Sequence, residues 1–568
     1  MSKKFVNKLE ETVDDALFGL VASNKDIQFC KTSKRVIHRS QINTENVSLI
    51  AGGGSGHEPY AAGYVGKGLL TAAVAGNIFA SPPSRNVQTS LEATKGKAGA
   101  ILFVINYTGD RLNFGLAAER FNASGGNARV VTISDDVAID NPNNRVGRRG
   151  LAGAVLTIKI AGAMSEEGRS LDEIYDMSQN VVNSLGTLGV SLYPGSQPGK
   201  DRETDLSNDQ IEIGLGIHGE PGKLRASYES AHKIVSDVMA TLKAKMKMKE
   251  SDEFVVLVNN LGSVSQLEMG IVNGEVLRWF EMEKMKVTRF YSGTYMTSLD
   301  GHGISVTVLR ADESMMKYLD APAKAPGWVP SLSHRNQAEQ SHSDKNAPIE
   351  VKSTGTSIHP DLVRECLNGV VKAMMDSEDQ LNTLDAQSGD GDCGSTFASA
   401  ARAIQKAEAL DYEHLETLLK QLSVIFEQTV GGTSGALYAL MFSAAAPELH
   451  EKIESNTILE ALKKANHAVQ KYGGARVGDR TMVDALDAMV EDLGKGLADN
   501  AGLDVFERAI QASENAAKET AHQKASVGRA SYTSSESQTK PDAGATAISI
   551  WFRAFWTAFK EEMGKTNK

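Results

Sequence analysis

The sequence predicts an α/β domain followed by an all-helical domain, and three observations support this prediction. Up to about residue 330, short β-rich apolar runs alternate with helix-like segments. Residues from about 321 to 356 are rich in Pro, Ser, His, Asn and Lys without periodic apolar spacing, which is linker composition. From Ser357 onward Ala, Leu, Glu and Lys dominate at helical spacing. We therefore predict an α/β domain at 1–330, a linker at 331–356 and a helical domain at 357–568.

Four apolar runs of the N-terminal part are predicted to be buried strands because each one ends in a polar loop. These runs are Val47–Ile50, Ile101–Ile105, Arg129–Ile133 and Phe254–Val258. Ligands of α/β sheets bind at the carboxyl ends of the strands, so we expect the functional side chains in the loops that follow. In the C-terminal part, segments such as Ile458–Ala465 predict a bundle or barrel of about eight helices.

The composition excludes several classes of protein. A formal net charge of −11 argues against a general nucleic-acid binder, which would show a basic face. No stretch approaches the roughly 20 apolar residues that span a bilayer, and no signal-peptide core follows Met1–Lys4. Three widely spaced cysteines, Cys30, Cys366 and Cys393, form neither a disulfide framework nor a zinc ligand set. We expect a cytoplasmic enzyme without nucleic-acid or membrane partners.

A run of acidic residues and glycines is the most informative feature of the helical part. Within Leu384–Thr396, the carboxylates of Asp385, Asp390 and Asp392 fall within eight residues. Their mutual repulsion is offset by a hard divalent cation such as Mg²⁺, which also bridges substrate phosphates. The segment that follows opens an apparent helix, whose free N–H groups and dipole favour bound phosphate. The run therefore predicts a nucleotide site.

Two alternatives to a nucleotide site are a solvated acidic turn and a calcium loop. The twelfth position of an EF-hand loop carries a bidentate Glu. Counting from Asp385 that position is Thr396, and counting from Asp390 it is Ala401. We favour phosphate-bridging Mg²⁺ over both alternatives.

The α/β part offers three candidate chemical groups. In Gly52–Pro59, a glycine run after a strand lets backbone N–H groups approach a small polar ligand, although a tight turn also explains it. His57 and Glu58 in this run favour a site. Asp110 follows the next strand and is placed to form an acid/base pair with His57, with a helix cap as the alternative. His218 lies between glycines, and its neutral imidazole is either a nucleophile towards a carbonyl or a structural residue.

Taken together, these segments closely resemble the ATP-dependent dihydroxyacetone kinases, a family whose animal members also appear as triokinase/FMN cyclase. The motifs are GGGSGHEP at 52–59, NYTGDRLNFG at 106–115, GIHGEPG at 216–222, GDGDCGST at 389–396, GGTSGALY at 431–438 and GRASY at 528–532. The resemblance covers essentially the whole chain. It implies a substrate domain of two α/β subdomains and a helical barrel that binds ATP.

The resemblance also implies roles for the N-terminal motifs. His218 matches the histidine that forms a covalent hemiaminal with the substrate carbonyl, which selects ketones and aldehydes over glycerol. Asp110 and His57 match the acid/base residues that activate the accepting hydroxyl. The matching substrate-binding loop is Gly54, Ser55 and Gly56.

In the helical part, the resemblance implies that Asp385, Asp390 and Asp392 hold two Mg²⁺ ions against the ATP phosphates. The residues that match nucleotide contacts are Cys393, Gly394, Ser395, Thr396, Thr433, Ser434, Gly474, Met482, Arg529, Asp542, Ala543 and Gly544. Fusion of both domains in one chain resembles the ATP-consuming branch of the family.

The chain departs from the family pattern at two positions. The family usually has Lys immediately before the Asn-Tyr-Thr-Gly-Asp segment, where it contacts the substrate, and this chain has Ile105. We expect weaker substrate binding from this loss. The family's Asp-Pro-Gly-Ala segment reads Asp542–Ala545 with Ala543 in place of Pro, which alters the stiffness of the loop.

The resemblance therefore predicts an ATP-dependent kinase of dihydroxyacetone and D-glyceraldehyde. For animal-type members it implies a second activity, FAD-AMP lyase (FMN cyclase), which converts FAD to cyclic FMN with Mn²⁺ in the helical site. The rival hypothesis is a non-catalytic regulator that senses the sugar in the same pocket. We expect a homodimer in which the helical domain of one chain caps the substrate domain of the other.

Overall fold

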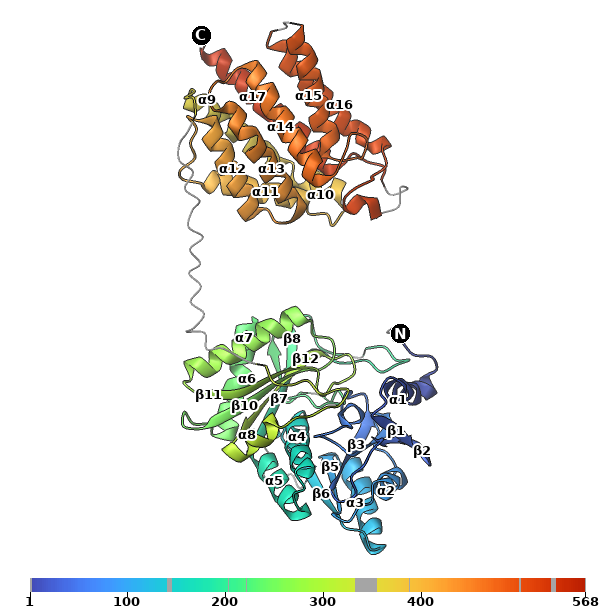
Figure 1. Ribbon diagram of the computed structural model, residues 1–568. Helices are drawn as coiled ribbons and strands as arrows, with labels where there is room; N and C mark the ends of the chain where they lie inside the picture. The colour runs from blue at the N-terminus through green and yellow to red at the C-terminus, as the bar shows by residue number, and fades with distance from the viewer. Residues whose placement is uncertain are drawn as a thin grey trace. The chain divides into compact units, whose positions relative to one another are not determined.

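The chain forms two compact units, Met1–His342 and Ser343–Lys568 (Figure 1). The computed structural model describes residues 3–139, 146–202, 204–220, 222–332, 355–387, 389–499, 502–532 and 538–566. An α/β unit followed by a helical unit confirms the predicted fold class. The predicted linker at 331–356 lies almost wholly outside the described residues, so the domain limits remain predictions.

The first sheet is mostly parallel and has the strand order β1-β2-β4-β3-β5-β6. Strands β4, β3, β5 and β6 run parallel to one another, whereas β2 pairs antiparallel with both β4 and β1 at one edge. The strands are β1 Ile27–Cys30, β2 Ser33–Arg39, β3 Ser48–Ser55, β4 Ala72–Ile78, β5 Ala100–Ile105 and β6 Ala128–Ile133. They include three of the four predicted strands.

Helices cover both faces of this sheet. Successive side chains of a strand point to opposite faces, so each strand contributes to two hydrophobic cores. Leu102 and Val104 of β5 pack with α2 (Ser84–Ala93) and α3 (Thr108–Ala123). Ile101 and Phe103 face the larger core. The helices that contribute to that core are α1 Thr12–Ala22, α4 Gly153–Glu166, α5 Leu171–Ser184 and α8 Glu313–Asp320.

The second sheet is mostly antiparallel, with the order β11-β10-β12-β7-β8-β9 and one parallel pair, β10 and β11, among the described strands. Its strands are β7 Leu185–Tyr193, β8 Gln210–Ile213, β9 Leu224–Ser227, β10 Glu253–Asn260, β11 Lys286–Gly293 and β12 His302–Arg310. Helices α6 (Ala231–Met246) and α7 (Gln266–Met282) cover one face. Helices α4 and α5 contact strands of both sheets, so the larger core lies between the sheets (Figure 1).

The helical unit is a closed barrel. Eight of the helices in the described part contact one another in turn, and α17 contacts α9 to close the ring. Their inward side chains form one apolar core. The helices are α9 Pro360–Asp376, α10 Glu378–Asp385, α11 Cys393–Lys406, α12 Leu415–Thr429, α13 Gly432–Ala445, α14 Ser455–Gly473, α15 Met482–Ala498, α16 Asp504–Glu519 and α17 Ala543–Thr566, of which α10 is an extra short helix outside the ring.

Short 3₁₀ turns complete the described structure at Leu9–Glu11, Ala62–Tyr64, Ala446–Leu449, Thr520–His522 and Arg529–Tyr532. No helix within the described ranges combines the length and the apolar character that crossing a membrane requires.

Candidate active site

The glycine run at the end of β3 forms part of the strand itself. The sequence predicted a turn after the strand, but β3 extends to Ser55. Glycine is needed here because a Cβ on Gly54 would lie 2.7 Å from the backbone nitrogen of Ala80, in the segment after β4. Ser55 Oγ donates to Gly76 O at 2.8 Å, and Gly56 N donates to the Glu58 carboxylate at 3.0 and 3.1 Å. The strand therefore brings its polar end close to the end of β4.

His57 follows this strand and is fully buried. Its Nδ1 lies 2.9 Å from Thr297 O, so Nδ1 carries the hydrogen and Nε2 keeps a lone pair. Within the described residues, Nε2 has no hydrogen-bond partner. Burial and the neighbouring His218 lower the pKa of His57 to about 3, so the ring is neutral at physiological pH. The neutral ring therefore presents a free lone pair on Nε2, which can accept a hydrogen bond.

The structure brings His218 to His57. The two ring centroids lie 4.9 Å apart, and Phe79 and Tyr107 pack against the His218 ring at 5.2 and 4.5 Å. His218 comes from the turn after β8, in the other subdomain, so the site lies between the two sheets of the α/β unit. This convergence agrees with the acid/base and nucleophile hypotheses without assigning the roles.

Glu220 orients His218. Its Oε1 lies 3.0 Å from His218 Nδ1, and its Oε2 accepts from His218 N at 3.0 Å. Burial alone would raise the pKa of Glu220, but the hydrogen bonds from His218 help to lower it to about 2. The carboxylate therefore holds the hydrogen on Nδ1 and leaves the lone pair on Nε2 of His218. The sequence motif contained Glu220, but its pairing with His218 was not predicted.

Asp110 lies in the first turn of α3, not in a loop as the sequence predicted, and is 3% exposed. Its Oδ1 has no hydrogen-bond partner in the described part of the chain. Burial raises the pKa of Asp110, while a hydrogen bond from Ser81 and the charge of His218 oppose the rise. A Cβ on Gly53 would lie 3.7 Å from Oδ1, so the carboxylate faces the glycine strand. The helix-cap alternative does not explain this placement.

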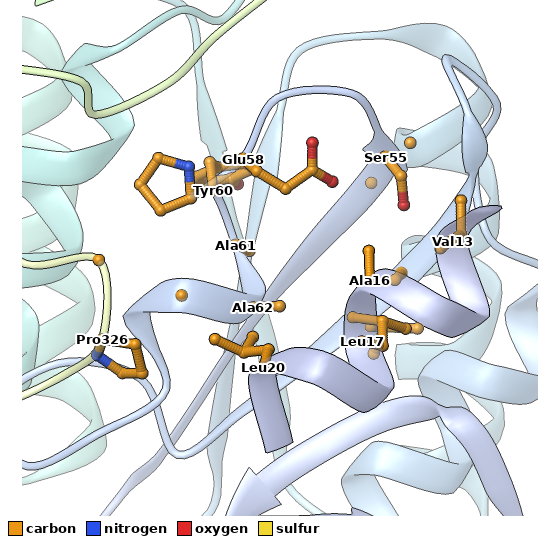
Figure 2. Close-up of a pocket in the computed structure, with 17 residues that line it drawn as sticks. Val13, Ala16, Leu17, Leu20, Ser55, Glu58, Tyr60, Ala61, Ala62 and Pro326 are labelled. Carbon is orange, nitrogen blue, oxygen red and sulfur yellow. The ribbon is translucent and has the colours of Figure 1, made fainter. Parts of the chain in front are cut away.

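A cavity of about 520 Å³ borders the other side of the glycine strand. Figure 2 shows Ser55 and Glu58 on one side of it and Leu17 and Leu20 of α1 on the opposite side. Gly54 also lines this cavity, whereas His57, Asp110 and His218 do not. The predicted substrate loop thus has two faces, of which one belongs to the His57–His218 cluster.

A second cleft, of about 490 Å³, lies in the helical unit. The predicted nucleotide and metal residues that line it are Asp385, Asp390, Asp392, Cys393, Thr396, Thr433, Ser434, Met482, Asp542, Ala543 and Gly544. These residues come from the starts of α11, α13, α15 and α17 and from the loop after α10. Several helix N-termini meeting at one cleft favour a phosphate-bearing ligand.

The three carboxylates form a compact set in this cleft. One ligand oxygen of each of Asp385, Asp390 and Asp392 lies within 4.8 Å of the others. Asp385 Oδ2 also accepts from Gly391 N at 2.9 Å and from Asp392 N at 3.1 Å, which folds the loop around it. Three carboxylates at this separation fit a hard divalent cation with oxygen ligands.

Some predicted nucleotide residues lie elsewhere. Ser395 Oγ accepts from Asn382 Nδ2 at 3.0 Å, and a Cβ on Gly394 would overlap Glu378 O, so both residues join α11 to α10. Gly474 caps α14 at a φ of 78° and does not line the cleft. The side chain of Arg529 lies outside the described residues. Nucleotide contact by these four residues remains a prediction.

Arg480 is a cleft residue that the sequence analysis missed. It is 1% exposed, and its Nη2 donates to Lys540 O at 2.8 Å. Burial raises the pKa of Asp542 to about 6, and the charge of Arg480 opposes this rise. Sequence reasoning had no signal for it, because an arginine in the turn before α15 resembles a surface residue. Its guanidinium lines the cleft beside the start of α15.

Comparisons with known proteins cover nearly the whole chain. The Dak1 domain family matches residues 18–327, and the DAK2 domain family matches residues 387–557. The triokinase/FMN cyclase of Mus musculus is 40% identical over 571 residues, spanning 97% of this chain and 98% of that protein. The crystal structure of the dihydroxyacetone kinase from C. freundii with AMP-PNP and Mg²⁺ is 33% identical, with a TM-score of 0.69, and covers 98% of this chain and 99% of that chain.

A regulatory protein of similar fold matches only the α/β part. The dihydroxyacetone kinase operon co-activator is 32% identical with a TM-score of 0.54, and the match covers 57% of this chain and 99% of that chain. The co-activator match thus leaves out more than two fifths of this chain, whereas both kinases match nearly all of it.

Proposed function

The chain belongs to the family of dihydroxyacetone kinases and triokinase/FMN cyclases, and we propose from this premise that it transfers the γ-phosphoryl group of ATP to dihydroxyacetone and to D-glyceraldehyde. One observation carries the proposal. The same chain holds a buried histidine pair suited to capture a carbonyl compound and a cleft with three carboxylates suited to Mg²⁺ and phosphate.

Capture of the triose begins at His218. Its Nε2 lone pair attacks the carbonyl carbon, so that a C–N bond forms and the C=O π bond breaks, and the carbonyl oxygen takes up a proton from water to give a hemiaminal. The carboxylate of Glu220, which accepts the Nδ1 hydrogen, stabilises the positive charge that the ring acquires. Glycerol has no carbonyl carbon for this bond, so it is excluded by chemistry that hydrogen bonding alone does not supply.

Deprotonation of the accepting hydroxyl is assigned to His57 and Asp110. Both present a buried atom, Nε2 and Oδ1, for which the described residues supply no hydrogen-bond partner. Burial lowers the pKa of His57 and raises that of Asp110, so the Asp110 carboxylate is the stronger base of the two, and the hydroxyl hydrogen passes to one of these two atoms as the oxygen attacks phosphorus. The pair thus orients the hydroxyl and receives its proton.

The nucleotide is assigned to the helical cleft. Asp385, Asp390 and Asp392 would hold Mg²⁺, which when bound neutralises phosphate charge and aligns the γ-phosphoryl group. The N-terminus of α11 and the guanidinium of Arg480 add positive potential on the protein side. These groups stabilise charge in place and need no reorganisation during transfer.

Three finer statements extend the proposal. FAD-AMP lyase activity with Mn²⁺ in the same cleft is favoured by the relatives named triokinase/FMN cyclase. A homodimer and a cytoplasmic location follow the expectations from the sequence. Release of AMP from FAD with Mn²⁺, light scattering and cell fractionation test these statements in turn.

The proposed function is tested by ADP release from ATP and Mg²⁺ with dihydroxyacetone, D-glyceraldehyde or glycerol as the acceptor. We expect turnover with both trioses and none with glycerol. Bound dihydroxyacetone without any turnover would overturn the kinase and favour the sugar-sensing regulator.

Replacing Glu220 by glutamine tests the orientation of His218. The amide keeps the size of the side chain but removes the charge that stabilises the ring. We expect kcat/KM for dihydroxyacetone to fall by roughly 10²-fold, with the Km for ATP unchanged. Glu212→Gln, on β8 and paired with Arg225, is a matched control that should retain wild-type kinetics. Equal kinetics of Glu220→Gln and wild type would remove Glu220 from the mechanism.

A further inference from the structure

A third cavity, of about 440 Å³, lies in the α/β unit and shares no lining residue with the two cavities described above. It lies beside the segment that follows α8. The side chains that matter for its chemistry are Lys159, Tyr291, Asp320, Lys324, Trp328 and Ser331. None of them has a role in the kinase proposal.

Lys159 is the unusual member of this lining. It belongs to α4, which is buried along nearly its whole length, and it is 1% exposed. Its Nζ donates to Tyr318 O at 2.5 Å, near the end of α8. No carboxylate oxygen of the described residues lies within 4.0 Å of this nitrogen. An ammonium has three N–H donors, so capping α8 leaves donors for a ligand.

The nearest carboxylate, Asp320, interacts electrostatically with this ammonium but forms no contact ion pair with it. Asp320 is bound by Arg289, whose Nε and Nη2 donate to its two oxygens at 2.7 and 2.5 Å. Lys324 pairs with Asp26 at 2.8 Å. Burial lowers the pKa of Lys159 to about 8, so the group is mostly charged at pH 7. The charge of Asp320 opposes this shift only in part, and a buried ammonium without an ion-pair partner in contact is unfavourable; an anionic ligand would supply that contact.

Another part of the cavity wall is aromatic and apolar. The rings of Tyr291 and Trp328 lie 5.8 Å apart at 55° and form an apolar surface beside the charged group. Such a surface favours a flat or ring-bearing body, and the indole adds a polar N–H.

We propose that this cavity binds a small organic anion, a carboxylate or phosphate monoester with a flat apolar body, with its charged oxygens on Lys159 and its body against Trp328 and Tyr291. The site is separate from both proposed substrate sites. Its ligand therefore adds a binding function to the kinase.

The test compares benzoate and phenyl phosphate with benzamide, the neutral analogue of benzoate. Dissociation constants are measured by ligand-observed NMR on the full chain without ATP or triose, so the outcome does not depend on the kinase proposal. We expect the anion to bind roughly 10-fold or more tightly than benzamide, as expected for a hydrogen bond to a charged group. Lys159→Met should abolish that difference.

Fluorescence of Trp328 locates the site in the wild-type fold. We expect benzoate to change the tryptophan emission of the wild type, and Trp328→Phe to lose this change while NMR still detects binding. If Lys159→Met does not fold, the preference of the wild type for benzoate over benzamide, with the Trp328 signal, decides the question. Equal binding of benzoate and benzamide, no binding of either anion, or unchanged binding by a folded Lys159→Met would overturn the proposal.

Discussion

Replacing His218 by alanine is expected to lower ketone-dependent ADP formation by roughly 10³-fold or more. The imidazole contributes the only atom in the proposal that bonds to the substrate carbon, and Glu220 holds it in the reactive tautomer. Without it, the hydroxyl of the triose is no longer fixed against His57 and Asp110. The loss should therefore appear in kcat as well as in Km, measured by coupled ADP release.

A matched histidine serves as the control for this substitution. His232, at the start of α6, also pairs with a carboxylate, Glu275, but its side chain is 64% exposed. We expect His232→Ala to keep wild-type turnover. Circular dichroism confirms that both variants fold. Substantial turnover by a folded His218→Ala would rule out covalent capture as a requirement.

Ile105 stands where the resemblance expects a lysine that contacts the substrate. The residue ends β5, is 1% exposed and belongs to the same core cluster as Phe103 and Ile133. An apolar side chain at this position contributes packing and no hydrogen bond to a hydroxyl group. In the proposed mechanism, substrate selection therefore depends mainly on the covalent bond to His218, which makes the His218→Ala result a strong test.

Local sequence was sufficient to predict the strands and the acidic loop. The runs at 101–105, 129–133 and 254–258 are strands β5, β6 and β10 with small shifts at their ends. The carboxylates of the acidic loop are separated by few residues, so their proximity follows from the sequence itself. In the helical part, the regular apolar spacing predicted a bundle or barrel, and the contact between α17 and α9 shows that it is a closed barrel.

Long-range contacts were not predictable in the same way. The side chain of His57 forms a hydrogen bond with the backbone oxygen of Thr297, and that of Lys159 forms one with the backbone oxygen of Tyr318. The partners are 240 and 159 residues apart in the sequence. Such contacts depend on how the two sheets pack around α4 and α5. The sequence predicted a turn for the glycine run because the close approach of β4, which requires glycine in strand β3, is also a long-range contact. Arg480 escaped notice because only the folded barrel buries it.

Replacing Asp385 by asparagine is expected to abolish most of the kinase activity and to weaken the apparent affinity for Mg²⁺ by roughly 100-fold. Asparagine keeps an oxygen that accepts from Gly391 N and Asp392 N, so the loop retains its two hydrogen bonds. What is lost is the negative charge beside Asp390 and Asp392. Asp385→Asn therefore tests the effect of the negative charge while the hydrogen bonds that shape the loop are kept.

Two readouts distinguish a ligand of the cation from a residue that only supports the loop. ADP formation is measured over a range of Mg²⁺ concentrations, and Mn²⁺ binding is measured directly by electron paramagnetic resonance. If Asp385 is a ligand of the cation, Asp385→Asn should bind Mn²⁺ more weakly and should recover part of its turnover at high Mg²⁺. Glu460→Gln, on the exposed side of α14 and paired with Lys463, should change neither. Unchanged Mn²⁺ binding by Asp385→Asn would remove this residue from the metal site, because a loss of activity would then arise from the loop alone.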